Sequence, residues 1–321
     1  MDTIGTIDKR EQMLRLARLY YVEGVGQSQL AKQEGISKAT VSRMLSLARE
    51  NGFVTITVND NLRDAKVLSR RLHEFFPTAD FTVVSTSQND RNEILDKVAS
   101  SVAKYLDGLV KSGDIIGFGG GESLSKVAAY LDDKKVRDVV VLSLMGMVTS
   151  PKYEIFTYET GFKLANAYQS TANFLPLPVI FDNSSTKELV EKESLVRYLE
   201  KLGRLANIAL ISLDAIEDSP ILNEMNYFDD EEKQEIRDNS VGDILGHFID
   251  DKGNIVNSKL EERLVTTPLS NLKHKEHSIV AVNKVETVPA LIATLKAQYC
   301  NRVFIDQYSA QVLIDSQNTI E

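Results

Sequence analysis

The sequence is poor in the residues that build disulfides and metal sites. Among 321 residues there are one cysteine, Cys300, four histidines and no tryptophan. A lone cysteine excludes a disulfide within the chain and suits a reducing cytoplasm. His274 and His277 lie three residues apart, but no neighbouring cysteine or carboxylate pattern completes a metal site. We therefore expect these two histidines at the surface, and we predict no metal.

Long apolar runs are also missing. No stretch reaches the ~18 consecutive apolar residues that a membrane-spanning helix needs. The first residues, MDTIGTIDKREQ, are polar and include acidic side chains, which a signal peptide lacks. These absences predict a cytoplasmic protein with no membrane partner.

The charge is unevenly distributed along the chain. The formal net charge of −9 argues against a protein that coats nucleic acid in general. Residues 1–52, however, hold eight Lys and Arg against six Asp and Glu, so the remainder carries −11. A length of 321 residues predicts two domains. A slightly basic head on an acidic body fits DNA contact confined to the head.

The stretch from Gln27 to Asn51 predicts a helix-turn-helix. Its apolar residues recur at helical spacing with one break, at Glu34-Gly35. Gly35 suits the left-handed position that ends a helix, and Ser37 has the side chain to cap the next one. The second helix of such a motif lies in the DNA major groove.

The outward residues of this second helix have the chemistry of DNA contact. Hydroxyl side chains and two long cations are left on its free face, as base reading and phosphate contact require. The candidate DNA-binding residues are Gln27, Ser28, Ser37, Lys38, Ala39, Thr40, Ser42 and Arg43. The alternative is an ordinary helical hairpin with a solvated face.

The segments on either side complete a small first domain. Residues 8–22 form an amphipathic pattern that predicts a supporting helix, and residues 53–58 alternate like a strand that would serve as a wing. We therefore predict a DNA-binding domain over residues 1–58 and a second domain over 59–321. Residues 61–76 open the latter with another amphipathic helix, either a linker or a dimerising helix, since palindromic operators require dimers.

From Asp80 onward the pattern alternates between strand and helix. Strands are expected at 81–84, 114–118, 139–144, 208–213, 279–282 and 303–306. Helices are expected at 91–110, 123–131, 162–168, 186–201, 229–237 and 288–298. Such alternation predicts an α/β domain with a largely parallel sheet and right-handed crossovers.

One glycine-rich loop of this domain carries candidate chemistry. The run IIGFGGGESL passes from a buried strand through glycines into a helix. Glycines let backbone N–H groups approach a ligand, and a helix N-terminus favours an anion, so phosphate is the expected guest. The spacing matches neither a Walker loop nor a dinucleotide fingerprint. The candidate residues are Gly119, Gly120, Gly121, Glu122 and Ser123; the alternative is a turn without a ligand.

Two further stretches are candidates for the same pocket. Gly146 lies directly after the strand expected at 139–144, and ligands of open α/β sheets bind beyond the carboxyl ends of strands. Asp182 and Asn183 close the apolar run PLPVIFDN and are suited to sugar hydroxyls. A simple turn explains these two residues equally well.

Taken together, these segments resemble the SorC family of bacterial transcriptional regulators over nearly the whole chain. The head resembles it through LARLYYVEGVGQSQLAKQEGISKATVSRMLSLARENGFVTITV. The body resembles it through DIIGFGGGESL, FLPLPVIFDN, YFDDEEK and VGDILGHFIDDKGNIVNSKLEERL. Within the family, the deoxyribonucleoside-regulator branch is especially similar in LPLPVIFDN, ANIAL and YFDDEEK.

The resemblance implies a dimeric or tetrameric repressor that binds an operator in double-stranded DNA. It implies a phosphorylated sugar as effector, no cofactor, and a body similar in fold to ribose-phosphate isomerases and glucosamine-phosphate deaminases. The loop at Gly119 to Ser123 would cradle the phosphate, and Asp243 matches an acidic effector contact of relatives. Arg263 matches a family arginine without an assigned ligand role.

Three departures from the family bear on the effector. Thr287 stands where many relatives have a phosphate-binding lysine, and Lys284 could replace it only if the loop folds differently. Met145 stands where the deoxyribonucleoside branch has a lysine able to form a Schiff base with an aldehyde sugar. The pair Gly119-Gly120 replaces a larger, polar pair, which predicts a roomier loop. The effector is therefore expected to differ from deoxyribose 5-phosphate or to bind weakly.

Two other functions are consistent with the residues. The first is a sugar-phosphate isomerase or deaminase, with Asp243 as base, although no lysine or histidine partner is evident near these loops. The second is a DNA-binding oligomer without ligand response. A ligand-controlled regulator explains most of the motifs, and it predicts no enzymatic activity.

Overall fold

The computed structural model describes residues 3–54 and 61–318. The chain separates into two compact units, residues 1–60 and 61–321. Each unit has a hydrophobic core of its own, and each is described by itself below.

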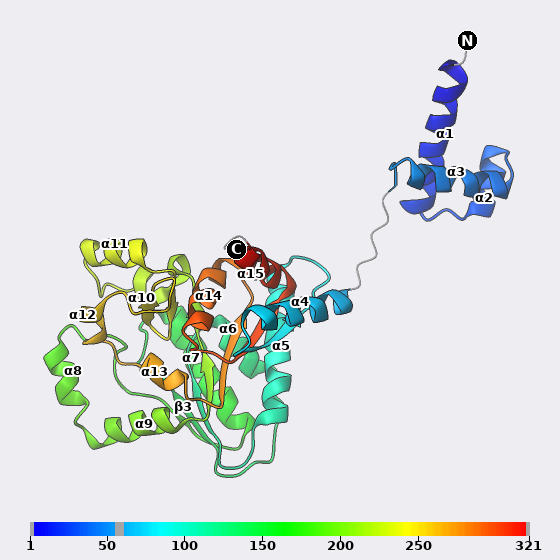
Figure 1. Cartoon of the computed structure of the whole chain (residues 1–321). Helices are drawn as coiled ribbons and strands as arrows, with labels where there is room; N and C mark the ends of the chain where they lie inside the picture. Colours follow the sequence, from blue (N-terminus) through cyan, green and yellow to red (C-terminus); the bar gives the residue numbers. More distant parts are fainter. Residues whose placement is uncertain (1–2, 55–60, 319–321) are drawn as a thin grey trace. The chain divides into compact units, whose positions relative to one another are not determined.

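The small unit is built from three helices, α1 (Thr3–Tyr21), α2 (Gln27–Glu34) and α3 (Lys38–Glu50) (Figure 1). Gly35 adopts φ 64°, and its N–H donates to the carbonyl of Ala31, which ends α2 in a left-handed turn. Ser37 caps α3 by accepting a hydrogen bond from the Thr40 N–H. Both features match the turn that the sequence predicts. The core of the unit consists of Met13, Leu16, Ala17, Leu30, Val41, Leu45 and Ala48.

Two boundaries of the small unit differ from the sequence prediction. The first helix was expected from residue 8, but α1 begins at Thr3. The strand expected over 53–58 falls largely on residues 55–60, which lie outside the described part of the chain. Phe53 and Val54, the two described residues of that segment, have no strand structure.

The large unit contains, within its described residues, a seven-stranded parallel sheet in the order β1-β10-β9-β5-β2-β3-β4. Its strands are β1 (Asp80–Val84), β2 (Ile115–Phe118), β3 (Val140–Ser143), β4 (Ala172–Asn173), β5 (Ile208–Ile211), β9 (His277–Val282) and β10 (Arg302–Asp306). β5 leads into a second, antiparallel sheet of β6 (Leu213–Asp214), β7 (Gly242–Ile244) and β8 (His247–Ile249). The largely parallel α/β domain predicted from the sequence is confirmed.

Helices cover both faces of the parallel sheet. They are α4 (Asn61–Phe75), α5 (Arg91–Leu109), α6 (Glu122–Ala129), α7 (Pro151–Ala167), α8 (Ser184–Val190), α9 (Ser194–Leu205), α10 (Pro220–Asn223), α11 (Asp230–Asn239), α12 (Ser258–Glu261), α13 (Leu269–Leu272), α14 (Val288–Lys296) and α15 (Gln307–Asn318). Short 3-10 turns are η1 (Ile216–Asp218) and η2 (Val285–Thr287).

Successive residues of each strand point to opposite faces, and the two cores follow this alternation. On β10, Phe304 packs in the core under α5, α6 and α7, whereas Ile305 packs in the core with α4, α14 and α15. On β5, Leu210 and Ile211 divide in the same way. The sheet is therefore buried on both sides, as parallel sheets are.

Two helix predictions require correction, and one helix of twelve residues was not predicted. The helix expected at 162–168 begins at Pro151, and the one expected at 186–201 is two helices, α8 and α9. The helix that was not predicted is the C-terminal α15. α4 packs against β1 and α15 with Leu72 fully buried, so its apolar stripe contributes to the large unit's own core.

Among the described residues we looked for a membrane-spanning helix and for a group of metal ligands. None of their helices combines the length and the apolar character that crossing a membrane requires. They also contain no group of three His, Cys, Asp or Glu placed to hold a metal ion. His274 is exposed as expected, but His277 is half-buried and its Nδ1 lies 3.1 Å from the Tyr105 hydroxyl.

Candidate functional site

The glycine loop, which holds five of the candidate ligand residues, lies where four parallel strands end. β2 leads into the glycine loop, β5 into Ser212, β9 into Asn283, and β10 ends at Asp306. Because the strands are parallel, their carboxyl ends lie at one edge of the sheet, where ligands of such folds bind. Ser123 Oγ donates to Asn283 Oδ1 at 3.1 Å, which joins the loop after β2 to the turn after β9.

The first two glycines of the loop are required by close packing. A Cβ on Gly119 would lie 2.6 Å from Ser212 Oγ, and a Cβ on Gly120 would collide with the Tyr153 ring. Both glycines are buried. The expectation of a roomier loop is therefore wrong here, because Tyr153 and Thr157 of α7 fill the space beside Gly120.

The third glycine has a different environment. Gly121 adopts φ 101° and ψ 165°, a conformation that residues with a side chain rarely adopt. A Cβ placed on Gly121 would have the Tyr153 ring as its nearest neighbour, at 3.6 Å. Gly121 forms the N-cap of α6, and no side chain accepts a hydrogen bond there. The first N–H groups of α6 therefore have no side-chain cap and are suited to an anion.

The glycine loop lies beside two cavities. A small one, about 30 Å³, is lined by residues 120–124, 211–214 and Ala281, which is room for roughly one water. A larger one, about 460 Å³, is lined by Asn89, Arg91, Ile94, Asp218, Asn283, Lys284, Val285, Glu286, Asp306, Tyr308 and Ser309. Asn283, which accepts the bond from Ser123, connects the loop with the larger cavity.

Two cations line the larger cavity, and each has an acidic neighbour. Lys284 Nζ lies 2.6 Å from Asp218 Oδ2, and Arg91 lies 3.5 Å from Glu122 at the start of α6. Thr287, by contrast, is buried. The loop after β9 thus places Lys284, and not residue 287, at the cavity. Lys284 is therefore the cation of this loop that could contact a phosphate in place of a lysine at position 287.

Carboxyl groups lie behind the glycine loop. Burial raises the pKa of Asp214 to about 7, with the neighbouring Asp243 adding to the shift and Lys284 opposing it. Burial also raises the pKa of Asp243, against hydrogen bonds from the Ser219 hydroxyl at 2.7 Å and the Gly246 N–H at 2.6 Å. Burial raises the pKa of Tyr153 well above its usual value, and both carboxyls contribute. Among Asp214, Asp243 and Tyr153, it is Asp214 that lines the small cavity.

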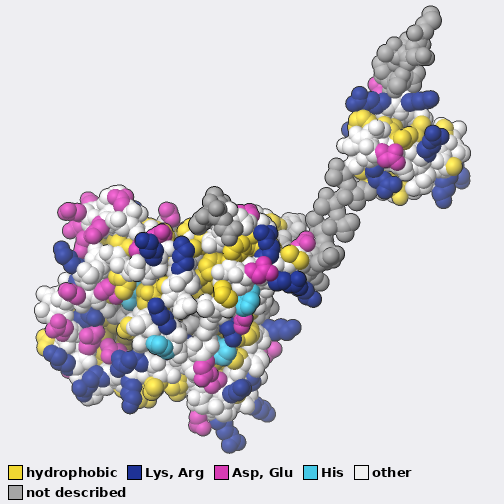
Figure 2. All heavy atoms as spheres, viewed as in Figure 1, with side chains coloured by type: hydrophobic (Ala, Val, Ile, Leu, Met, Phe, Trp, Pro, Cys, Tyr) yellow, Lys and Arg dark blue, Asp and Glu magenta, His cyan; other side chains and the backbone are white. Residues whose placement is uncertain are grey.

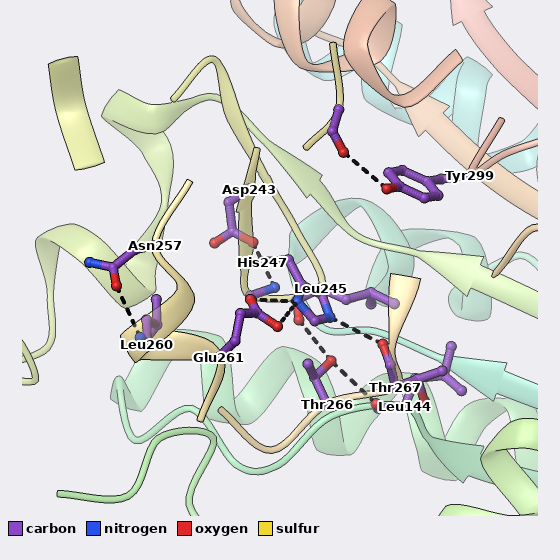
Figure 3. Close-up of polar contacts among 12 residues, drawn as sticks. Leu144, Asp243, Leu245, His247, Asn257, Leu260, Glu261, Thr266, Thr267 and Tyr299 are labelled. Carbon is purple, nitrogen blue, oxygen red and sulfur yellow. Dashed lines mark hydrogen bonds and ion pairs between the residues drawn. The ribbon is translucent and has the colours of Figure 1, made fainter. Parts of the chain in front are cut away.

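Asp243 belongs to a polar network that holds β7 and β8 against the segment 264–267 (Figure 3). His247 is buried, with Nδ1 2.9 Å from Glu261 and Nε2 3.1 Å from the Thr267 carbonyl. The Thr267 N–H in turn donates to the Leu144 carbonyl at 2.7 Å. These hydrogen bonds hold the backbone of β7 and β8, which carries Asp243, and the backbone of Leu144, where the loop after β3 begins.

Gly146 lies within that loop and is held by backbone contacts. Its N–H donates to the Val265 carbonyl at 2.8 Å, and a Cβ would lie 2.7 Å from the Pro178 carbonyl oxygen. Asp182 and Asn183 are exposed, and Asn183 caps α8 by accepting from the Ser185 N–H. None of these three residues lines the two cavities beside the glycine loop.

Sequence reasoning missed several residues of the cavities. Arg91, Asp214, Asp218 and Asn283 come from four separate segments, whereas Lys284 was already named from the sequence. Asp214 and Asn283 each follow a predicted strand within two residues, so their position beyond a strand end was a usable signal. Arg91 carried none, because the start of α5 is brought to the site by tertiary folding.

In the small unit, most of the candidate DNA-binding residues lie on the side of α3 that faces away from the core. Lys38, Ala39, Ser42 and Arg43 are exposed, whereas Val41 is buried in the core. Lysine and arginine side chains stand out on the surface of this unit, while Asp and Glu gather over α11 in the large unit (Figure 2). Gln27 and Ser28 open α2, and Ser37 and Thr40 share a hydroxyl contact of 2.8 Å.

Comparisons with known proteins agree with this architecture. Residues 60–315 match the family model described as "Putative sugar-binding domain". The chain is 34% identical over 308 residues to the deoxyribonucleoside regulator of Bacillus subtilis (strain 168), covering 96% of this chain and 98% of that protein. It is 24% identical to the sorbitol operon regulator of Klebsiella pneumoniae, covering 94% of this chain and 97% of that protein.

Solved structures share the fold. The crystal structure of the full-length sorbitol operon regulator SorC from Klebsiella pneumoniae matches with a TM-score of 0.69 and 23% identity, over 96% of this chain and 99% of that chain. A transcriptional regulator from Streptococcus pneumoniae TIGR4 matches with a TM-score of 0.73 and 18% identity, over 80% of this chain and 98% of that chain.

Fold and family model together define a transcriptional regulator with a sugar-binding domain. The chain belongs to the SorC family of these regulators. The relatives named here are regulators rather than enzymes.

Proposed function

We propose that the protein is a DNA-binding transcriptional repressor of a deoxyribonucleoside or other carbohydrate operon, controlled by a phosphorylated sugar. Residues 1–58 form the DNA-binding domain, and residues 59–321 bind the effector and associate into a dimer or tetramer. The protein acts in the cytoplasm, with neither a metal nor a cofactor. The names of the deoxyribonucleoside and sorbitol operon regulators support this class of operon.

For DNA binding, α2 and α3 act as a helix-turn-helix with α3 in the major groove. The left-handed turn at Gly35 and the cap at Ser37 support this assignment. Arg43 reads a base edge, and Lys38 contacts phosphate, because both are exposed on the free side of α3. Gln27, Ser28, Ala39, Thr40 and Ser42 complete the contact surface.

The observation that carries the effector proposal is the uncapped start of α6 behind Gly121. A phosphate placed there accepts hydrogen bonds from backbone N–H groups and from Ser123 Oγ. Lys284, released from Asp218, and Arg91, released from Glu122, supply positive charge from the larger cavity. Lys284 would thus replace the phosphate-binding lysine that many relatives have at the position of Thr287.

One hydroxyl of the sugar reaches toward the carboxyl groups, because the small cavity in front of them has room for roughly one water. Asp214 lines the small cavity and, when protonated, can donate to a sugar hydroxyl as well as accept from one. Asp243 lies behind it, with one hydrogen bond to each carboxyl oxygen, and supports its position. Gly146, Asp182 and Asn183 act at the site only if the segments 146–149 and 176–183 move toward it. In this proposal, the large unit has a fold similar to that of ribose-phosphate isomerases and glucosamine-phosphate deaminases.

An isomerase or deaminase activity is the second candidate function, and Asp214 is the observation that favours it. A carboxyl with a pKa of about 7 is suited to act as a general base near neutral pH. Release of product from fructose 6-phosphate, ribose 5-phosphate or glucosamine 6-phosphate tests it directly, and no turnover is expected.

The regulator proposal is tested by gel shift. The full-length protein is mixed with DNA from the region upstream of its own operon, and a panel of sugar phosphates is added. We expect specific binding that one of these compounds changes at least tenfold. Specific binding that none of them alters would indicate a DNA-binding oligomer without ligand response.

A further inference from the structure

A third cavity of the large unit, of about 240 Å³, is separate from the two beside the glycine loop. The end of β3, the helices α8 and α9, and the segment 264–268 line it. It shares no lining residue with the other two cavities. Its volume is below the ~300–1,000 Å³ of pockets for drug-sized ligands, so a molecule of a single ring is the size that fits.

Part of the lining of this cavity is apolar and firmly held. Four buried leucines contribute to it, namely Leu144, Leu175, Leu199 and Leu264. Leu175 and Leu199 also belong to a small hydrophobic cluster with Val265, which holds α9 against the segment 264–268. The apolar surface is therefore fixed by the protein's own packing, as in most small-molecule sites.

The charges in the lining balance one another. Lys187 Nζ of α8 lies 3.1 Å from Glu191 Oε1, and Arg204 Nη1 of α9 lies 3.8 Å from Glu200 Oε2. These four are the charged residues among the described residues that line the cavity, so its lining has no net charge. A phosphate group would bring a charge of about −2 next to two carboxylates, which repel it. The charge balance therefore favours an uncharged ligand.

The same four side chains offer both acceptors and donors. Burial raises the pKa of Glu200, and the nearby Glu191 adds to the shift. A carboxyl group that is shielded from water in this way forms a stronger hydrogen bond with a ligand hydroxyl than an exposed one does. The Lys187 ammonium and the Arg204 guanidinium are donors only, so they suit the oxygen atoms of the same hydroxyl groups. Acceptors and donors beside an apolar surface match a ring that carries several hydroxyls.

We propose that this cavity binds an uncharged monosaccharide ring, either free or as the sugar of a nucleoside whose base lies outside the cavity. The C–H groups of the ring pack on the leucines. Its hydroxyls donate to Glu191 and Glu200 and accept from Lys187 and Arg204. The large unit would then hold an unphosphorylated sugar here and a phosphorylated one at the start of α6.

The cavity is joined to the glycine loop by a short chain of contacts. The Thr267 N–H donates to the Leu144 carbonyl at 2.7 Å, and Thr266 Oγ1 donates to the Leu245 carbonyl at 2.8 Å (Figure 3). A Cβ on Gly119 would collide with the Leu245 side chain, so Leu245 touches the glycine loop. A ring that shifts the segment 264–268 therefore changes the affinity of the glycine loop for its ligand, and the reverse also holds. This coupling rests on the proposed function, whereas binding in the cavity does not.

The test is a ligand-observed NMR titration of the full-length protein without DNA or sugar phosphate. The probes are 2-deoxyribose, ribose, glucose and thymidine, each added separately. Glu200→Ala and Glu191→Ala are each expected to weaken binding of a bound probe at least tenfold, because hydrogen bonds to a charged acceptor are lost. Glu188→Gln is the matched control, since it is an exposed acid of α8 outside the cavity, and it should stay within twofold of wild type. Equal thermal melting profiles establish that each variant is folded.

The probes also distinguish the two sources of the ring. Binding of a free sugar supports the first source, and binding of thymidine alone supports the nucleoside. Binding of none of the probes, or binding that survives both Glu200→Ala and Glu191→Ala, would overturn the proposal.

Gly121→Val separates this site from the proposed effector site. It should lose sugar-phosphate binding and keep binding of the uncharged ring within twofold of wild type. Loss of the uncharged ring in this variant would overturn the proposal, because the ring would then occupy the glycine loop. Intact binding of the ring by a protein that binds neither operator nor sugar phosphate would count against the proposed function alone. Isothermal titration with a sugar phosphate, with and without the ring, tests the coupling, and equal affinities would overturn it.

Discussion

Ser123, on the first turn of α6, donates a 3.1 Å hydrogen bond to the side chain of Asn283, the first residue after β9. This bond joins the glycine loop to the turn that carries Lys284. A phosphate bound at the start of α6 would compete with Asn283 for the same hydroxyl. The two residues therefore allow the binding role of Ser123 to be separated from a structural one.

Ser123→Ala is expected to weaken sugar-phosphate binding by about 1.5–3 kcal/mol, because it deletes one hydrogen bond to a charged acceptor. Asn283→Ala is the matched control, since it removes the same bond from the free protein and leaves the hydroxyl in place. Isothermal titration measures both. Equal losses in the two variants would mean that Ser123 only positions the loop.

Arg43→Ala is expected to cost about 1–3 kcal/mol of operator binding and to relax the preference at one base pair. Lys38→Ala should weaken binding to all sequences and flatten its salt dependence, because a phosphate contact carries no sequence information. Fluorescence anisotropy with operator and scrambled DNA at several salt concentrations distinguishes the two. Operator affinity unchanged in Arg43→Ala would contradict the assignment of α3 as the reading helix.

Asp214→Asn is expected to stabilise the protein at pH 8 and above. The pKa of this half-buried carboxyl is raised to about 7, so ionising it in the folded state is unfavourable. Its contribution to stability is present below the unfolded pKa near 4 and is lost as pH rises through about 7. The gain should be about 1–4 kcal/mol above pH 8 and near zero at pH 4.

Urea unfolding at the two pH values measures this difference. Asp218→Asn is the control, because its carboxylate is partly exposed and paired with Lys284. A difference between wild type and Asp214→Asn that does not change with pH would show that Asp214 stays ionised throughout.

Met145 is buried and offers no amine, so the loop after β3 cannot form a Schiff base through it. Borohydride reduction in the presence of deoxyribose 5-phosphate should therefore trap no adduct on the peptide spanning residues 139–152. Mass spectrometry of the digest checks this. A mass increase there would point to Lys152 as the amine.

The sequence predicted the parts of this protein that local patterns determine. Buried strands such as β2 and β5 read as continuous apolar runs, and Gly35 with Ser37 marks the turn between α2 and α3. The break between α8 and α9 was missed because residues 191–193 contain neither glycine nor proline. α7 was underestimated because apolar residues on two sides hide a single helical stripe.

The candidate site was only partly predictable for a related reason. The glycine loop is contiguous in sequence, so its chemistry can be recognised locally. Arg91 and Lys284 reach the larger cavity through the packing of α5 and the course of the turn after β9, which no local pattern records. Packing also explains why residues 119 and 120 are glycines, because a side chain there would collide with Ser212 or Tyr153, which come from distant segments.

The central claim is that the start of α6 binds the phosphate of an effector through its backbone. Gly121→Val tests it most directly, because valine does not readily adopt φ 101° and its side chain would block the approach of an anion. Titration with a panel of sugar phosphates, alongside operator binding, should show lost effector affinity and operator affinity close to wild type, since the small unit has its own core. Unchanged effector affinity in Gly121→Val would contradict the account and move the search to Asp182, Asn183 and Asp243.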